Sequence, residues 1–244
     1  MMTAVYRIAD KNISIDSLYG RVHDYCRDYL TEEPAELSVR ITEEDIEYER
    51  SRSERTAELE GRAPHKVSDE YLEELAVYRK ISELMPYHGT FLFHGSCIAV
   101  EGEGYLFTAV SGTGKSTHAA LWRQLLGDKT VMVNDDKPLI KVTDRGAVIY
   151  GTPYNGKHRL GSNISVPLKA IALLERSEEN SIEAVTAGEL YPRLIQQMYR
   201  PADPAALALS MSLIDRLLLQ VKLYRLKVNM DISAAETAYN AMKG

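Results

Sequence analysis

A short glycine-rich segment offers the clearest chemistry in the sequence. It reads Ala109-Val110-Ser111-Gly112-Thr113-Gly114-Lys115-Ser116-Thr117, a phosphate-binding P-loop with alanine in place of the usual first glycine. Glycines let the backbone N–H groups turn toward one point, the lysine can reach the β- and γ-phosphates, and the serine hydroxyl after it can ligate Mg²⁺. The pattern predicts nucleotide binding by Ser111, Gly112, Thr113, Gly114, Lys115, Ser116 and Thr117, with Ser116 also a metal ligand.

A pair of carboxylates supplies the second chemical feature. Asp135 and Asp136 come directly after the strand predicted over residues 130–133. Ligands of open α/β sheets bind at the carboxyl ends of strands, so one carboxylate there can hold Mg²⁺ and the other can accept a hydroxyl proton. A weak base suffices, because phosphoryl transfer passes through a loose transition state. The alternative is that residues 134–136 form only a polar turn.

Further candidates lie on either side of these motifs. His94, followed by Gly95, can orient or tune an aspartate, or it is a packed histidine in the strand predicted over residues 91–100. The segment 151–161 holds three glycines and the cations Lys157 and Arg159. Those two side chains can clamp a phosphate or neutralise transition-state charge, or they belong to a solvated basic turn.

Composition limits the classes of protein to consider. The chain has 244 residues, 45% hydrophobic and 26% charged, which suits one large globular domain or one with an appendage. Residues 1–90 carry 12 Lys and Arg against 20 Asp and Glu, whereas the rest carry 17 against 15. We therefore expect no nucleic-acid partner. Neither a transmembrane stretch nor a signal peptide is evident, and two cysteines make no disulfide framework, so we expect a cytoplasmic protein without a membrane partner.

Apolar periodicity and turn residues predict mixed strands and helices. We expect strands over residues 4–8, 13–15, 37–41, 91–100, 105–110, 130–133, 139–142, 147–150, 168–174 and 221–228. The strands over 139–142 and 147–150 are expected to form a hairpin around residues 144–146. We expect helices over residues 18–30, 69–85, 115–126 and 232–242, and one that opens at Asp203-Pro204. Thr42 and Asp45 form a helix-start box before a charged segment, to about residue 66, that is a solvated helix or a mobile loop. A P-loop needs a strand before it and a helix after it, and this order supplies both.

The ordered set of motifs resembles the HPr kinase/phosphorylase catalytic domain, whose P-loop type is shared with ATP-dependent phosphoenolpyruvate carboxykinase. The resemblance is carried by residues 111–117, by His94-Gly95 before them and by Asp135-Asp136 after them. It implies that Asp135 is the catalytic base, that Asp136 helps to hold Mg²⁺ and that His94 supports the aspartate. The expected fold is α/β, a mixed sheet with this P-loop plus a small α+β N-terminal region. The expected domains are an acidic N-terminal region, 1–87, and a catalytic domain, 88–244.

The main functional hypothesis is an ATP- and Mg²⁺-dependent kinase that phosphorylates a hydroxyl group. The partners would be a nucleoside triphosphate and a protein, peptide or small-molecule acceptor, and the reaction could run backwards as a phosphorylase. Lys115 would stabilise the transferred group, and Lys157 or Arg159 would add a further cation. The resemblance also makes a homo-oligomer plausible. The alternatives are a nucleotide-binding regulatory module without significant turnover and an NTPase that couples hydrolysis to motion.

Overall fold

The structure, a computed structural model, describes residues 1–61, 63, 66–156 and 158–244. The chain divides into two compact units, Met1–Leu84 and Met85–Gly244. Each unit has strands and helices of its own, which confirms the mixed α/β class expected from the sequence. The boundary after residue 87, with catalysis assigned to the second part, stays a prediction.

The first unit contains a three-stranded sheet. Strand β1 (Met2–Ile8) pairs antiparallel with β2 (Lys11–Ser17), and β2 pairs parallel with β3 (Leu37–Arg40). The helix expected over residues 18–30 is wrong in length: only α1 (Arg21–Tyr25) and the 3-10 turn η1 (Arg27–Tyr29) form. The reason is that the backbone N–H groups of Leu18 and Tyr19 donate to the buried Glu73 carboxylate instead of entering a helix.

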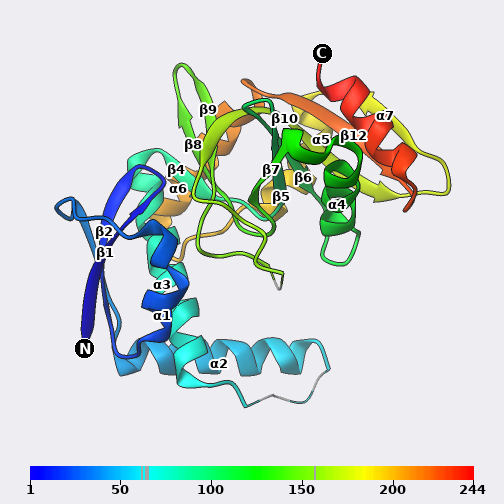
Figure 1. Cartoon of the computed structure of the whole chain (residues 1–244). Coiled ribbons are helices and arrows are strands. Elements are labelled where there is room, and N and C mark those ends of the chain that lie inside the picture. The colour runs from blue at the N-terminus through cyan, green and yellow to red at the C-terminus, as the bar shows by residue number, and fades with distance from the viewer. Residues whose placement is uncertain (62, 64–65, 157) are drawn as a thin grey trace. The chain divides into compact units, whose positions relative to one another are not determined.

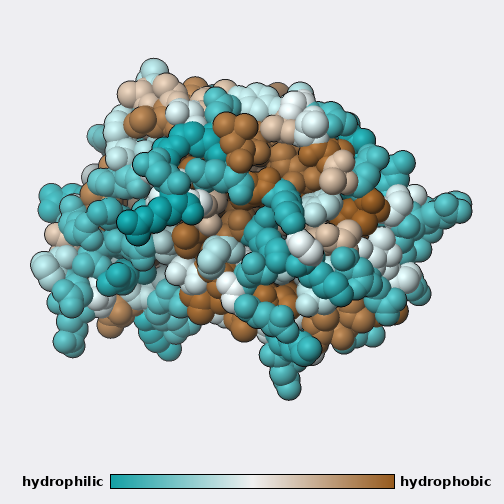
Figure 2. All heavy atoms as spheres, turned by 90° about the horizontal axis from the view of Figure 1, so that it is seen from above, coloured by the Kyte–Doolittle hydropathy of each residue, from teal (hydrophilic) through white to brown (hydrophobic). Residues whose placement is uncertain are grey.

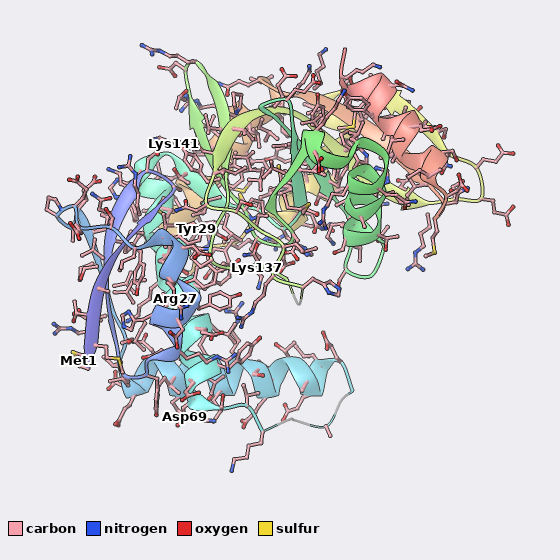
Figure 3. The ribbon with its side chains drawn as sticks, in the orientation of Figure 1. Met1, Arg27, Tyr29, Asp69, Lys137 and Lys141 are labelled. Carbon is pink, nitrogen blue, oxygen red and sulfur yellow. The ribbon has the colours of Figure 1, made fainter. Side chains whose placement is uncertain are left out.

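Two charged helices complete this unit. The expected helix-start box is confirmed, because Thr42 accepts from the Asp45 backbone and Asp45 accepts from the Thr42 backbone at the start of α2 (Glu43–Leu59). Helix α3 (Asp69–Leu84) packs against α2, and Figure 3 labels Asp69 at its first residue. Arg79 on α3 pairs with Asp45 and with buried Glu49, both 3.0 Å or less away. Helix α2 is therefore anchored by ion pairs rather than by an apolar stripe.

The second unit is built on a nine-stranded sheet (Figure 1). Its order is β4-β8-β9-β10-β6-β5-β7, with β12 beside β10 and β11 beside β12. The strands are β4 (Thr90–Leu92), β5 (Ser96–Val100), β6 (Glu103–Thr108), β7 (Thr130–Asn134), β8 (Leu139–Thr143), β9 (Gly146–Tyr150), β10 (Ser165–Arg176), β11 (Ser181–Ala184) and β12 (Lys222–Val228). The hairpin expected around residues 144–146 is confirmed by the antiparallel pairing of β8 and β9.

Strand directions bring the chemical motifs to one edge of this sheet. Strand β10 runs parallel to β6 and to β12. Strand β5 is antiparallel to both β6 and β7, so β6 and β7 point the same way. The carboxyl ends of β6, β7, β10 and β12 and the amino end of β5 therefore share one edge.

The single strand expected over residues 91–100 is wrong. The structure divides it into β4 and β5, and His94 and Gly95 lie between them. The backbone N–H of His94 donates to the Gln197 carbonyl over 2.8 Å, outside the ladder. A Cβ on Gly95 would lie 2.9 Å from the Phe107 carbonyl oxygen, so only glycine fits this close approach. His94 is thus placed by a connection, not by a strand.

Helices cover both faces of the sheet. Helices α4 (Lys115–Leu126) and α7 (Ile232–Met242) lie side by side on one face (Figure 1), around a core that includes Trp122 and Phe107. The other face is packed by α5 (Ala187–Leu194), the 3-10 turn η4 (Ile195–Gln197) and α6 (Pro204–Leu218). The remaining 3-10 turns are η2 (Met85–His88) and η3 (Gly127–Lys129). The opening of α6 is confirmed, because Asp203 accepts from the Ala205 and Ala206 backbones.

The last features of the fold are the hydropathy of one face and the composition of the helices. The face drawn in Figure 2 is mixed, with hydrophobic side chains gathered in several places among hydrophilic ones. None of the helices that the structure describes combines the length and the apolar composition needed to span a membrane.

Candidate active site

The glycine-rich loop, residues 109–117, connects β6 to the first turn of α4. Gly112 has φ +80° and Gly114 has φ +121°, backbone conformations that only glycine adopts without strain. Gly114 is the N-cap of α4, so the helix presents its unsatisfied N–H groups at the end of the loop. Ser111, Ser116 and Thr117 are exposed. The predicted nucleotide-binding residues therefore form one accessible turn at a helix N-terminus, a setting that suits an anion.

Lys115 lies under this loop. Its residue exposure is 8%, and Nζ donates to the backbone carbonyl of Ala109 over 3.0 Å. Burial lowers the pKa of Lys115, and the charge of Asp136 opposes that shift. Ala109 is itself buried in the core beside α4, which accounts for a methyl group where the usual pattern has glycine. The ammonium group is thus held at the base of the loop and near one of the two predicted carboxylates.

Arg176, at the end of β10, holds the outer side of the loop. Its Nε donates to the Thr113 carbonyl over 3.2 Å, and its Nη2 donates to the Gly112 carbonyl. These bonds occupy two consecutive carbonyl groups of the loop. The sequence analysis missed Arg176, because 63 residues separate it from Thr113 and no local pattern marks it.

The two aspartates stand on a turn that Asn134 organises. The Asn134 side-chain oxygen accepts from the backbones of Asp136 and Lys137 over 2.9 and 2.6 Å. Its amide group donates to the Thr152 hydroxyl over 3.0 Å. Asn134 is fully buried, so the turn after β7 is tied to the segment 151–161 from inside the protein.

Asp135 is enclosed by that segment. Its residue exposure is 6%, and its two carboxylate oxygens accept from the backbones of Gly156 and Leu160 over 2.6 and 3.4 Å. A Cβ on Gly156 would lie 3.3 Å from one of these oxygens, so the close approach favours glycine. The carboxylate is fixed in place and still has lone pairs that can accept a proton.

Asp136 faces the histidine. His94 Nε2 lies 3.3 Å from one Asp136 oxygen, and Lys137 Nζ lies 3.5 Å from the other; Figure 3 labels Lys137 in the connection after β7. Burial raises the pKa of Asp136, but the hydrogen bond from His94 and the charge of Lys137 outweigh it, and the pKa lies below its usual value. The structure thus brings His94 to Asp136, while Asp135 is held by backbone groups.

Gln197 fixes the other side of the histidine ring. Its side-chain oxygen lies 3.0 Å from His94 Nδ1, so both ring nitrogens have partners. Gln197 is the last residue of η4 and is 103 residues from His94 in sequence. A chain of contacts therefore runs from Gln197 through His94 to Asp136, and the sequence gives no sign of its first member.

Lys157 and Arg159 are the two cations expected from the segment 151–161. Lys157 falls among the residues that the structure does not describe. Arg159 is exposed, with φ +50°, in the same segment that encloses Asp135. His118, which follows the loop on α4, is buried in the core, where its Nε2 accepts from Trp122 over 3.0 Å. Burial lowers the pKa of His118 to about 4.

A pocket of about 290 Å³ opens beside the glycine-rich loop. Its wall combines Val110 and Thr113 of the loop, the end of β10 over residues 173–176, and Arg193, Gln196 and Gln197 from α5 and η4. The loop, the carboxylate turn, the His94 connection and this pocket all lie at the shared edge of the sheet. That arrangement can hold a polyphosphate against fixed carboxylates.

Comparisons with known proteins give a distant likeness. No protein family matches the chain by its sequence profile, and no curated protein matches it. Among solved structures, the chain is similar to the Hpr(Ser) kinase/phosphatase from Coxiella burnetii, with 11% identity and a TM-score of 0.33 over 63% of this chain and 99% of that one. A likeness this weak does not show that the chain belongs to that family.

Proposed function

We propose that the chain is an ATP- and Mg²⁺-dependent kinase that transfers the γ-phosphoryl group to a hydroxyl acceptor. The observation that supports this most is that the glycine-rich loop and the Asp135-Asp136 turn lie at the same edge of the sheet. The charge of Asp136 also raises the pKa of Lys115, against the effect of burial. Binding without transfer needs only the loop. A pair of fixed carboxylates beside it adds what a transfer reaction requires.

Each residue has a distinct role in this proposal. The loop N–H groups and the N-terminus of α4 bind the phosphates, and Lys115 stabilises negative charge on the transferred group. Asp135, held by the Gly156 and Leu160 N–H groups, accepts the proton of the acceptor hydroxyl. Arg159 adds positive charge from the segment that encloses Asp135. The proton passes to a carboxylate whose position is fixed before the acceptor arrives.

The side chains at this edge suit Mg²⁺. Magnesium prefers oxygen ligands and usually takes one or two protein groups together with water and substrate phosphates. The exposed Ser116 hydroxyl and the ionised Asp136 carboxylate are such groups. Within the described residues no three His, Cys, Asp or Glu side chains are grouped around a metal position, so these two would act with the phosphates. When bound, the ion would neutralise charge on the phosphates.

One observation favours a second candidate function. Asp135 is buried and both of its oxygens already accept backbone hydrogen bonds, which is also what a purely structural aspartate would show. In that case the chain would be a nucleotide-binding module without significant turnover. The two functions differ in what the loss of the Asp135 charge does to turnover.

The test compares Asp135→Asn with wild type, using Mg²⁺-ATP and γ-labelled phosphate. Transfer to serine-containing peptides, to glycerol and to water is measured beside the Kd for ATP. We expect turnover to fall at least about 100-fold, the size of a general-base contribution, with an unchanged Kd. Asp128→Asn, at an exposed aspartate of η3, is the control. Turnover that is absent from wild type, or unchanged in Asp135→Asn, would overturn the kinase proposal.

A further inference from the structure

The pocket beside the glycine-rich loop lies on a defined side of the phosphate site. The glycine-rich loop follows β6 and the Asp135-Asp136 turn follows β7, and these two strands end at the same edge of the sheet. In the sheet, β7 and β10 lie on opposite sides of β6, the strand that carries the loop. A triphosphate whose last phosphate meets Lys115 and Asp136 therefore leads away toward β10, where the pocket opens.

The side chains of the pocket offer groups that suit a nucleoside. Val110 is 59% exposed in the loop and gives an apolar contact for a planar base. Arg193 is exposed on α5, and its side chain makes no hydrogen bond or ion pair with another residue that the structure describes. A guanidinium plane stacks well on aromatic rings. Gln196 provides amide donors and an acceptor, and Glu175 provides a carboxylate that can accept from ribose hydroxyls.

The volume of the pocket and the existing contacts of its side chains limit which part of a ligand it can hold. The volume of about 290 Å³ lies just below the usual range of about 300–1,000 Å³ for ligand pockets, which fits part of a larger ligand. The side chain of Arg176 is already engaged with loop carbonyls, and Gln197 is engaged with His94, so these two form fixed walls. Gln197 contacts His94, which contacts Asp136, so the carboxylate turn with the proposed base Asp135 lies beyond this wall of the pocket.

From this arrangement we infer that the pocket between the glycine-rich loop, the end of β10 and α5–η4 binds the nucleoside part of the triphosphate, with Arg193 and Gln196 contacting the base. This inference rests on one part of the proposed function, the binding of a nucleotide at the glycine-rich loop. It does not depend on phosphoryl transfer. It assigns nucleoside recognition to residues that no motif marks. The acceptor would then approach from the side of the loop where the Asp135-Asp136 turn lies.

Binding measurements on the whole chain can separate nucleoside contacts from phosphate contacts. The variants are Arg193→Ala and Gln196→Ala, with Arg145→Ala at the exposed β8–β9 turn as the matched control. Calorimetry measures the Kd of Mg²⁺-ATP and of Mg²⁺-tripolyphosphate for each. We expect ATP to bind about tenfold more weakly to Arg193→Ala and severalfold more weakly to Gln196→Ala. Tripolyphosphate should bind all four proteins equally.

Two other binding results would contradict the inference. If ATP affinity is unchanged in both variants, the inference is wrong, and a raised acceptor KM would then assign the pocket to the acceptor. If ATP and tripolyphosphate weaken by the same factor, Arg193 is a phosphate contact and the inference is also wrong. Because these readouts are binding constants, they stay decisive if wild type shows no turnover, which would overturn only the kinase proposal.

Discussion

The Arg176 side chain donates from Nε to the backbone carbonyl of Thr113 over 3.2 Å. The same guanidinium also reaches the carbonyl of Gly112. These two bonds hold consecutive carbonyls of the loop on its outer side. A planar fork suits two neighbouring acceptors, which a lysine cannot reproduce.

Loss of this fork should weaken nucleotide binding. In Arg176→Ala the two carbonyls lose their partners and the loop samples more conformations. Because the guanidinium is exposed, we expect a cost of about 1 kcal/mol, or about fivefold in the Kd for Mg²⁺-ATP, with a smaller effect in Arg176→Lys. Calorimetry measures the Kd for Mg²⁺-ATP of Arg176→Ala and Arg176→Lys, with Arg145→Ala as the control. An unchanged Kd in Arg176→Ala would show that the contact does not position the loop.

The contact between His94 and Asp136 predicts a pH effect. Asp136 has a pKa below its usual value of 3.8, so it stays ionised at lower pH than a free aspartate. Burial raises this pKa, and His94 and Lys137 lower it, so His94→Leu should leave burial opposed by Lys137 and raise the pKa of Asp136. The acid limb of the pH profile of kcat should then move to higher pH, while the Kd for ATP near pH 8 changes little. The same acid limb in both proteins would contradict the assigned role.

Local patterns predicted many elements of the second unit and selected the residues of the candidate site, whose roles stay predictions. Helix α7 (Ile232–Met242) and the hairpin follow from periodicity and turn residues, which act over a few positions. The break at His94-Gly95 could not be predicted, because it depends on a bond to Gln197. Arg176 and Gln197 were missed for the same reason. Contacts between residues far apart in the chain leave no short-range signal in the sequence. The sequence patterns also did not predict strand β11 (Ser181–Ala184) or helix α5.

The buried His118 predicts a dependence of stability on pH. Its pKa falls from 6.5 to about 4 in the folded protein because burial disfavours the charged ring. The unfolded chain therefore binds a proton that the folded one does not, so stability from this group is complete above pH 6.5 and is lost as the pH falls toward 4. The full difference is about 3 kcal/mol at 1.36 kcal/mol per pKa unit.

Urea unfolding between pH 7.5 and about 4 measures this loss. In His118→Phe, which keeps an aromatic ring against Phe107, the free energy of unfolding should fall less over this range than in wild type. Trp122→Phe removes the hydrogen-bond donor to His118 and part of the buried ring volume but keeps His118 itself, so it serves as the comparison for the pH slope. Equal pH slopes in wild type and His118→Phe would rule out His118 as the source.

Gly151 tests how far the carboxylate turn depends on close packing. A Cβ at this position would lie 1.9 Å from the Ser162 carbonyl oxygen and 2.6 Å from that of Val133, so the backbone must move in Gly151→Ala. We expect a destabilisation of about 1–3 kcal/mol or more, with weakened support of Asp135 by the displaced segment. In Gly188→Ala, at the start of α5, a Cβ meets nothing within 4 Å, so stability should stay level or rise. Urea unfolding and ATP turnover of the two variants make the comparison, and a Gly151→Ala protein as stable and active as Gly188→Ala would show that the turn tolerates displacement.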